Sequence, residues 1–187
     1  MPETFCAVVL AGGTGARLGG LDKATVEHDG STLLEHCLAA LADAVEIVVV
    51  GPAVPTSRPV TFTLEDPPGG GPAAGLLAGR DALPRLPQSL AVLAVDMPYV
   101  DAGTFRRLRE AWAVKPRAGG AFLVDADGRR QLAGVLDPAL LGNREDHRHL
   151  PMHALLDGLD LVPVSAVGRE ATDIDTWGDV HKLRSGP

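Results

Sequence analysis

A glycine-rich segment with two basic residues carries the clearest chemical signal in the sequence. It reads Leu10-Ala11-Gly12-Gly13-Thr14-Gly15-Ala16-Arg17-Leu18-Gly19-Gly20-Leu21-Asp22-Lys23. Glycine allows positive φ and close approach of backbone N–H groups to a ligand, so such a segment can cradle a polyphosphate. Arg17 and Lys23 add positive charge, and Lys23 is one of only three lysines against fourteen arginines. The segment therefore predicts a phosphate site; the alternative is a long surface turn.

Two common phosphate-binding signatures do not fit this segment. A Walker A loop requires Gly-Lys-Ser/Thr after the glycines, and that triplet is absent. A dinucleotide fingerprint that began at Gly13-Thr14-Gly15 would need glycine at position 18, where the sequence has Leu18. The predicted phosphate site is therefore of another kind.

An aspartate at the end of an apolar run is the second signal. Asp96-Met97-Pro98-Tyr99 directly follows the apolar residues 89–95. An acid just after a parallel strand lies at the carboxyl edge of the sheet, where α/β proteins bind ligands. Mg²⁺ takes one or two carboxylates together with phosphate oxygens and water, so Asp96 suits that ion. The alternative is that Asp96 caps a turn or the next helix.

Paired acids near the C-terminus could complete a metal site. Asp173-Ile174-Asp175-Thr176 places two carboxylates on one face of an extended chain, where they could hold the metal or its waters. The alternative is that Asp175 caps the helix that follows.

A second glycine cluster, at residues 65–75, could receive the nucleoside. It contains Asp66, Gly71, Pro72 and Gly75, and its glycines let a base or ribose lie against the backbone. The alternative is a flexible loop.

Alternating strands and helices must position these residues. Apolar runs bounded by turn residues predict strands at 5–10, 46–50, 60–64 and 89–95. Helical spacing predicts helices over 34–41, 72–83 and 103–112. Thr32 and Glu35 predict a capping box at the first helix, with Glu35 reaching back. The alternation is typical of an α/β fold, a mostly parallel sheet with helices on both faces.

The second half of the chain is less regular. Asp125-Ala126-Asp127-Gly128 between the runs 121–124 and 131–136 predicts a hairpin. An exposed loop is expected at 143–149, a helix at 152–159, a strand at 161–164, and a closing helix at 176–183 capped by Thr176. No repeat or long linker divides the chain, so residues 1–187 are expected to form a single domain.

Composition and charge exclude several classes of partner. The chain of 187 residues is 45% hydrophobic with net charge −7, and no basic run exceeds two residues, which argues against nucleic acid and membrane surfaces. No apolar stretch is long enough for a membrane span, and the acidic N-terminus lacks the shape of a signal peptide. Cys6 and Cys37 lie in apolar segments and are expected to be buried free thiols in a cytoplasmic protein.

Together these residues resemble the molybdenum cofactor guanylyltransferase family, the MobA-like nucleotidyltransferases. The family's opening motif has Leu-Ala-Gly-Gly, then Ser, Arg-Met-Gly and, after a short spacer, Asp-Lys; here Gly15 replaces the Ser and Leu18 the Met. Residues 96–99 are similar to the family's Asp-x-Pro-Tyr, whose Asp binds Mg²⁺. Residues 71–75 are similar to its Gly-Pro-Leu-Ala-Gly, which lies near the guanine.

The resemblance implies a Rossmann-like nucleotidyltransferase fold with one antiparallel strand, and transfer of GMP from GTP to the phosphate of molybdenum-bearing molybdopterin with release of pyrophosphate. It implies Arg17 and Lys23 as catalytic groups that stabilise the pyrophosphate. It implies that Asp96 holds Mg²⁺, with Asp175 and then Asp173 as further ligands. The implied nucleotide-binding residues are Leu10, Ala11, Gly12, Gly13, Thr14, Gly15, Lys23, Asp66, Gly71, Pro72, Gly75 and Asp96. Besides GTP and molybdopterin, proteins that deliver the cofactor to molybdoenzymes are implied as partners.

Two segments depart from the family pattern and keep alternatives open. Residues 173–177 stand where the guanylyl enzymes commonly have Asn-Val-Asn-Thr-Pro. The Asp-x-Asp-Thr form of residues 173–176 is similar to the cytidylyl branch, and Trp177 replaces the Pro. Arg130-Gln131-Leu132 stands where the family often has His-Pro on the pterin side. The alternatives are cytidylyl transfer to molybdopterin, nucleotidyl transfer to a sugar or other small phosphate, and a non-catalytic nucleotide-binding regulatory protein.

Overall fold

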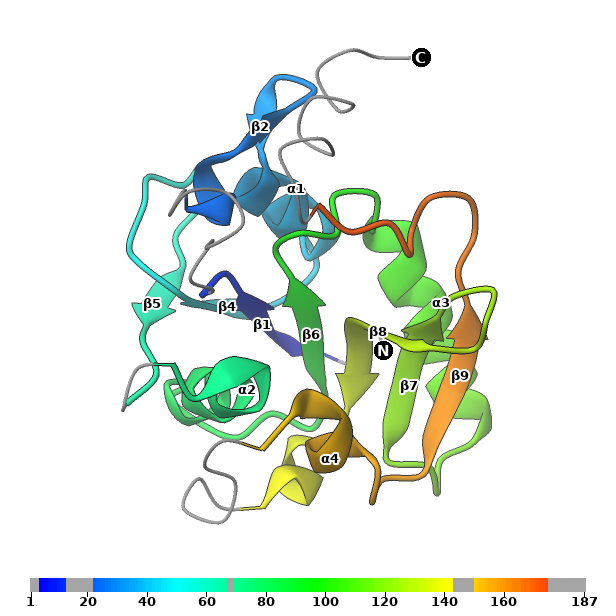
Figure 1. Cartoon of the computed structure of the whole chain (residues 1–187). Coiled ribbons are helices and arrows are strands. Elements are labelled where there is room, and N and C mark those ends of the chain that lie inside the picture. Colours follow the sequence, from blue (N-terminus) through cyan, green and yellow to red (C-terminus); the bar gives the residue numbers. More distant parts are fainter. Residues whose placement is uncertain (1–3, 13–21, 67–68, 143–149, 175–187) are drawn as a thin grey trace.

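A seven-stranded sheet forms the centre of the molecule (Figure 1). The structure, a computed structural model, describes residues 4–12, 22–66, 69–142 and 150–174. The strands, in sheet order, are β5 (Thr61–Thr63), β4 (Glu46–Val50), β1 (Cys6–Leu10), β6 (Leu90–Ala94), β8 (Arg130–Leu136), β7 (Gly120–Val124) and β9 (Leu161–Ser165). Only β8 is antiparallel to its neighbours, β6 and β7, within this sheet. The predicted α/β fold with a mostly parallel sheet is therefore confirmed.

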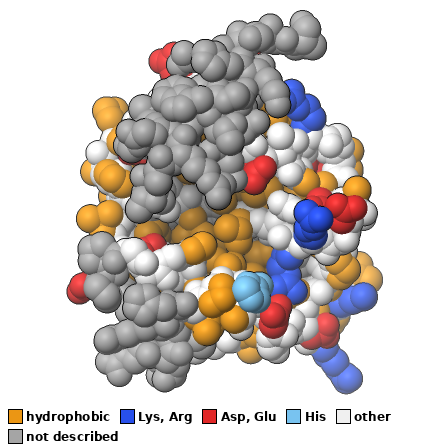
Figure 2. All heavy atoms as spheres, in the orientation of Figure 1, with side chains coloured by type: hydrophobic (Ala, Val, Ile, Leu, Met, Phe, Trp, Pro, Cys, Tyr) orange, Lys and Arg blue, Asp and Glu red, His pale blue; other side chains and the backbone are white. Residues whose placement is uncertain are grey.

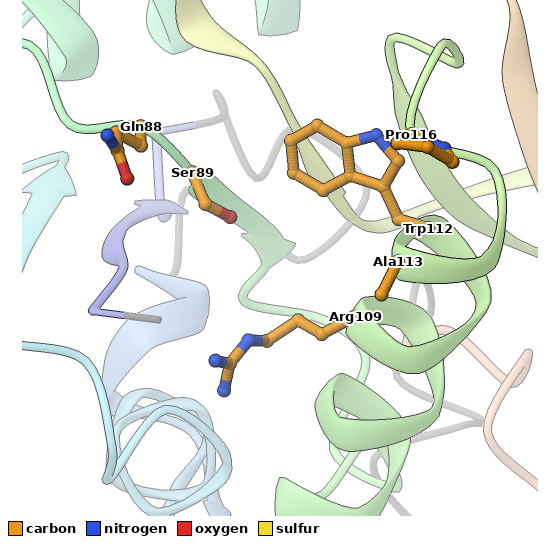
Figure 3. A pocket seen from close by; sticks show the side chains of 6 residues that line it. All are labelled: Gln88, Ser89, Arg109, Trp112, Ala113 and Pro116. Atoms are coloured by element: carbon orange, nitrogen blue, oxygen red, sulfur yellow. The ribbon is translucent and has the colours of Figure 1, made fainter. Parts of the chain in front are cut away.

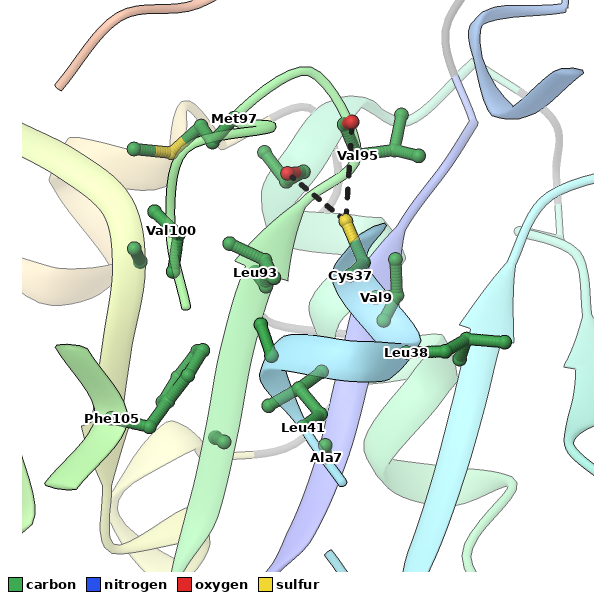
Figure 4. Packing of buried hydrophobic residues seen from close by; sticks show 14 of the residues in the cluster. Ala7, Val9, Cys37, Leu38, Leu41, Leu93, Val95, Met97, Val100 and Phe105 are labelled. Carbon is green, nitrogen blue, oxygen red and sulfur yellow. Dashed lines mark hydrogen bonds between the residues drawn. The ribbon is translucent and has the colours of Figure 1, made fainter. Parts of the chain in front are cut away.

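Helices cover both faces of the sheet. Side chains alternate along a strand, so Ala7 and Val9 of β1 face one layer while Val8 and Leu10 face the other. The first layer contains α1 (Leu33–Ala40) and α3 (Ala102–Val114), and the second contains α2 (Gly71–Asp81) and α4 (Met152–Leu156). Figure 4 shows Cys37, Leu38 and Leu41 at α1 packed against β1 and β6. Burial on both faces explains why the strands are continuous apolar runs.

The second layer requires glycine where α2 crosses β1. A Cβ at Gly79 would lie 2.5 Å from Val8 Cγ1 and 3.0 Å from Val50 Cγ2. One turn earlier, a Cβ at Gly75 would lie 3.1 Å from Glu65 Oε1 and 3.3 Å from Leu10 Cδ2. The two glycines let α2 pack closely on the sheet, directly beneath the end of β1.

The cap of α1 differs from the predicted capping box. Thr32 Oγ1 accepts a hydrogen bond from Glu35 N at 3.2 Å, as expected. The Glu35 carboxylate, however, accepts from Ser57 N and Ser57 Oγ instead of reaching back to the N-cap. The reach-back prediction is wrong because a loop 22 residues away offers two donors to the same carboxylate. A full capping box does form at α3, between Asp101 and Thr104.

Other elements match the predictions with small shifts at their ends. The predicted hairpin is β7–β8, and Asp125 Oδ1 accepts from Asp127 N and Arg129 N in its turn. The helix expected at 152–159 ends at Leu156. A short hairpin of β2 (Glu27–His28) and β3 (Ser31–Thr32) was not predicted. The loop expected at 143–149 and the closing helix at 176–183 lie outside the described residues. No helix in the described ranges is both long and apolar enough to cross a membrane.

Candidate active site

The carboxyl ends of β1, β4 and β6 are level and joined to one another. Leu10 pairs with Val50 on one side and Ala94 on the other. Beyond the strands, Ala11 N donates to Val50 O at 2.9 Å and Val95 N donates to Leu10 O at 3.1 Å. These bonds fix the starts of the two segments that carry the glycine-rich run and Asp96.

An ion pair joins the two predicted site segments at this edge. Lys23 Nζ lies 2.9 Å from Asp96 Oδ2, across 73 positions of sequence. The two side chains are 19% and 24% exposed, so the pair is partly screened from water but open to a ligand. The sequence placed both residues in one phosphate and metal site, and the structure brings them into direct contact.

Lys23 is held by a short 3₁₀ helix, η2 (Lys23–Thr25). Asp22 caps it, because its Oδ1 accepts from Ala24 N at 3.0 Å. The buried Ala24 and Val26 anchor the turn in the first core layer. The lysine therefore projects from a fixed backbone.

The chain segment before the C-terminus returns to Asp96. Ile174 N donates to Asp96 O at 2.9 Å, and Ile174 is buried while Asp173 is exposed. This contact places the backbone at Ile174, next to the predicted acid Asp173, beside the aspartate. Asp175 lies outside the described residues.

The donors at this edge fit a hard divalent cation. Asp96 presents a carboxylate at the sheet edge that already contacts a positive charge. No group of three or more potential ligands among His, Cys, Asp and Glu exists within the described ranges. Mg²⁺ and Mn²⁺ do not need one, since they are commonly held by one or two carboxylates with waters and substrate phosphates.

The phosphate-binding segment is described only at its ends. Gly12 is exposed after β1, whereas Leu10 and Ala11 are buried and the Ala11 N–H is used within the sheet. Gly13, Thr14, Gly15 and Arg17 lie outside the described residues.

The second glycine cluster divides into an open part and a packed part. Gly71, with φ of +82°, opens α2 with nothing near its missing Cβ, and Pro72 beside it is exposed, as is Asp66. Gly75 is buried against Glu65 and Leu10. Asp66, Gly71 and Pro72 can therefore contact a ligand at the surface. Gly75 instead determines how closely α2 packs on the sheet.

Two clusters of polar and aromatic side chains contact the loop that follows Asp96, and the sequence analysis did not find them. His28 is 7% exposed, its ring lies 5.5 Å from the Tyr99 ring, and Arg169 Cζ lies 3.9 Å from the Tyr99 centroid. His28 Nδ1 and the Tyr99 hydroxyl have no hydrogen-bond partner among the residues that the structure describes. Burial lowers the pKa of His28, and the Arg169 and His36 charges act in the same direction, against Asp29.

The second cluster centres on Glu170, a carboxylate 7% exposed. Thr104 Oγ1, Arg107 and Val167 N all donate to it. Burial would raise the pKa of Glu170, but these hydrogen bonds and the Arg107 charge outweigh it and hold the pKa below its ordinary value. No local pattern marks Glu170, because its partners on α3 lie more than sixty positions away.

The face of the sheet that carries α4 is hollowed beside β7 and β9. Figure 2 shows hydrophobic side chains gathered on this face, with a histidine among charged side chains. The cavity measures about 490 Å³ and is lined by Phe122, Val124, Gly128, Arg130, His153, Asp157, Leu161, Val162 and Pro163. Val124 ends β7, which runs in the same direction as β6. One rim of the cavity therefore lies at the same sheet edge as Asp96.

A further cavity, of about 430 Å³, lies at the opposite edge of the sheet. Figure 3 shows Gln88 and Ser89, just before β6, facing Trp112 and Pro116 at the end of α3, with the Arg109 side chain extending from α3 below them. This cavity meets the amino end of β6, so it is separate from the Asp96 site.

Comparison with known proteins identifies the family. The model of the MobA-like NTP transferase domain matches residues 7–160. The molybdenum cofactor guanylyltransferase of Acidiphilium cryptum is 40% identical over 119 residues, 60% of this chain and 61% of that protein. The molybdenum cofactor guanylyltransferase of Cupriavidus pinatubonensis is 30% identical over 191 residues, 97% of this chain and 85% of that protein. The chain thus spans about three-fifths of the length of the first relative and most of the second.

Solved structures share the fold. Molybdopterin-guanine dinucleotide biosynthesis protein A from Archaeoglobus fulgidus matches with a TM-score of 0.73 at 20% identity, over 96% of each chain. Rv0371c from Mycobacterium tuberculosis, solved in complex with manganese, matches with a TM-score of 0.69 at 17% identity over the whole of both chains. The family model matches well over half of this chain, and the alignment with the Cupriavidus protein covers nearly all of it. This chain therefore belongs to the family of MobA-like NTP transferase domains.

Proposed function

We propose that this protein transfers GMP from GTP to the phosphate of molybdopterin, with release of pyrophosphate. The observation that carries the proposal is the Lys23–Asp96 pair at the carboxyl edge of the sheet, reached by the end of the glycine-rich segment. The names of the relatives support the choice of guanylyl group and acceptor.

The reaction needs no protein nucleophile. An oxygen of the acceptor phosphate attacks the α-phosphorus of GTP, and the bond from that phosphorus to the bridging oxygen breaks. Pyrophosphate leaves with the electron pair. Both reactants are anions, so the protein must supply positive charge and N–H donors where negative charge develops.

Different residues of the chain are proposed to supply the positive charge, the metal ligands and the N–H donors. Lys23 contributes a compact positive charge from a fixed backbone. Arg17 is the proposed source of a second positive charge. Asp96 and Asp173, with Asp175, are the proposed holders of Mg²⁺, which when bound offsets the charge of the phosphates. Residues 12–15 would give N–H groups to the phosphates, while Asp66, Gly71 and Pro72 would meet the nucleoside.

The cavity beside α4 supports a place for the acceptor. The apolar wall of the cavity suits a planar ring. Arg130 adds a positive charge to its lining, and Arg130 Nη1 lies 3.6 Å from Asp157 Oδ1. Adjacent strands are about 4.8 Å apart, so β7, two strands from β6, is roughly 10 Å from it. An acceptor of molybdopterin size can span that distance.

Cytidylyl transfer is the second candidate, favoured by one observation. Residues 173–176 have the Asp-x-Asp-Thr form of the cytidylyl branch. The first test is pyrophosphate release from GTP, CTP, UTP and ATP in turn, with Mg²⁺ and molybdopterin. Release from GTP alone supports the guanylyl assignment, and release from CTP alone replaces it. Binding of nucleotide without release from any of the four would leave the non-catalytic alternative.

Two further expectations belong to this proposal. Both cysteines are free and buried, which suits a reducing compartment such as the cytoplasm. Proteins that deliver the cofactor to molybdoenzymes are proposed as partners on the family resemblance alone.

A further inference from the structure

The segment of residues 166–174, here called the arm, links β9 to the active site. It leaves β9 where Ala166 N donates to Val124 O, crosses the start of α3, and ends where Ile174 N donates to Asp96 O. Only Glu170 and Ile174 are buried within it, and Val167 is 62% exposed. The arm therefore has little apolar burial to fix its course.

The Glu170 carboxylate holds the arm against α3. Its two oxygens accept from Arg107 Nη1 at 3.0 Å and Nη2 at 2.7 Å, a paired contact between planar groups. Oε1 also accepts from Thr104 Oγ1 at 2.6 Å, and Oε2 from Val167 N at 2.7 Å. One carboxylate thus ties the backbone of the arm to two side chains of α3.

The same contacts reach the loop that follows Asp96. Thr104 is also the partner of Asp101 in the capping box that ends this loop. Arg169, next to Glu170, stacks on Tyr99 within the loop. The arm and the Asp96 loop are therefore held to each other at both ends, through Glu170 at one and Ile174 at the other.

We propose that Glu170 is a positioning residue for the metal site: by holding the arm on α3, it keeps Asp173 next to the point where Ile174 N donates to Asp96 O. This inference rests on the proposed function, since it takes Asp96 as a metal ligand. A carboxylate placed this way acts on the ligand geometry without touching the metal. Loss of such supporting contacts typically costs metal proteins about 10- to 100-fold in affinity.

The test measures Mn²⁺ binding, by electron paramagnetic resonance of the free ion, in the presence of the α,β-methylene analogue of GTP. Glu170→Gln keeps the size of the side chain but removes its charge, and it replaces one of the two acceptor oxygens facing Arg107 with an NH2 donor. We expect its Mn²⁺ dissociation constant to rise about tenfold or more. The affinity for the analogue without metal should stay within about twofold, because residues 12–23 are untouched.

Matched variants separate positioning from stability. Arg58 also holds backbone on the same face, donating to Leu41 O, Ala42 O and Ala44 O, but touches nothing in the arm. Arg58→Met should lower the melting temperature without changing Mn²⁺ affinity. Arg107→Met should repeat the Glu170→Gln result, and Arg107→Lys, which keeps the charge but not the paired geometry, should fall between it and the parent. If Glu170→Gln does not fold, Arg107→Lys provides the measurement.

Asp96→Asn distinguishes the two ways in which the idea could fail. If Asp96→Asn leaves Mn²⁺ binding unchanged, the proposed metal site is wrong and the inference falls with it. If Asp96→Asn abolishes binding while the Glu170 and Arg107 variants melt lower but bind Mn²⁺ as the parent does, Glu170 is only structural. No acceptor is needed, so the outcome does not depend on the identity of the transferred group.

Discussion

Lys23 Nζ lies 2.9 Å from Asp96 Oδ2, so the proposed phosphate-binding cation contacts one of the two oxygens of the carboxylate that we propose as a metal ligand. The two proposed roles therefore compete for one position. A metal on this carboxylate meets a positive charge already beside it, and must displace the ammonium to bind through Oδ2. A triphosphate that draws Lys23 away would remove that rival charge. Metal and nucleotide are expected to bind cooperatively for this reason.

The first prediction follows from this competition. Lys23→Met should strengthen the binding of Mn²⁺ alone, because it removes a rival positive charge. A partly exposed ion pair contributes up to about 1 kcal/mol, so the expected gain is about fivefold. Turnover with GTP should fall roughly 10²- to 10³-fold, the usual effect of losing one charge-stabilising donor. Weaker Mn²⁺ binding in the variant would contradict the competition, and turnover within a few-fold of the parent would contradict the catalytic role.

Asp96→Asn is expected to remove almost all metal-dependent activity while the protein still folds. The side chain lies at the sheet edge, outside the core, and asparagine has nearly the same size and can keep a turn or cap hydrogen bond. Thermal unfolding and pyrophosphate release should be measured on the same sample. An unchanged melt with full activity would mean that Asp96 serves only the local backbone.

Much of this arrangement could be predicted from the sequence because burial and ligand chemistry leave local patterns. The strand before Asp96 is buried on both faces, so it is a continuous apolar run, and glycines mark the segment that follows β1. That the segments after β1 and β6 start side by side follows from parallel strands that end at one edge. No comparable pattern marks Glu170, whose burial depends on Arg107 and Thr104 of a distant helix.

The errors in the prediction have the same cause. Glu35 has the spacing of a capping box, yet Ser57 from a remote loop takes its carboxylate. Asp29-Gly30 is a good hairpin turn, with φ of +47° and +80°, but its strands are two residues long and polar. A local sequence pattern indicates which partners a side chain can have, but the partner that it has in the structure depends on tertiary contacts that the pattern does not contain.

Arg130 should affect the acceptor rather than the nucleotide. Arg130→Met keeps the length of the side chain but removes its charge from the cavity beside α4. We expect the KM for molybdopterin to rise about tenfold, as one charged hydrogen-bonding group is lost, with the KM for GTP unchanged. Arg129→Met is the matched control, since Arg129 is the residue before Arg130, in the turn that precedes β8, and is 77% exposed. A rise in the KM for GTP instead would place Arg130 on the nucleotide side.

Gly79→Ala tests the close contact between α2 and β1. The new Cβ would meet the two methyl groups of Val8 at 2.5 and 2.9 Å, inside the core, where neighbours cannot move aside. Overpacking of this kind costs about 1–3 kcal/mol in the free energy of unfolding, measured by urea titration. Gly158→Ala is the control, because nothing lies within 4 Å of its Cβ position, and its effect should stay within about 0.5 kcal/mol. Equal stability of the two variants would show that α2 can shift outward.

Acid should destabilise the protein through Glu170 and Asp101. Hydrogen bonds from Thr104 lower the pKa of Asp101, and those from Arg107, Thr104 and Val167 lower the pKa of Glu170 against the effect of burial. A carboxyl whose pKa is lower in the folded state binds fewer protons there than in the unfolded chain. Its stabilising contribution is therefore complete above the ordinary value, 4.5 for Glu170, and is lost as the pH falls through the folded-state pKa.

Urea titrations at a series of pH values below about 5 should thus show the free energy of unfolding falling with pH in the parent. The slope should be shallower in Glu170→Gln, which has no proton to bind at this position. The single substitution should leave the part of the slope due to Asp101. If parent and variant lose stability in parallel as the pH falls, the Glu170 carboxyl has the same proton affinity in the folded and unfolded chains. Its hydrogen bonds with α3 would then not form in solution.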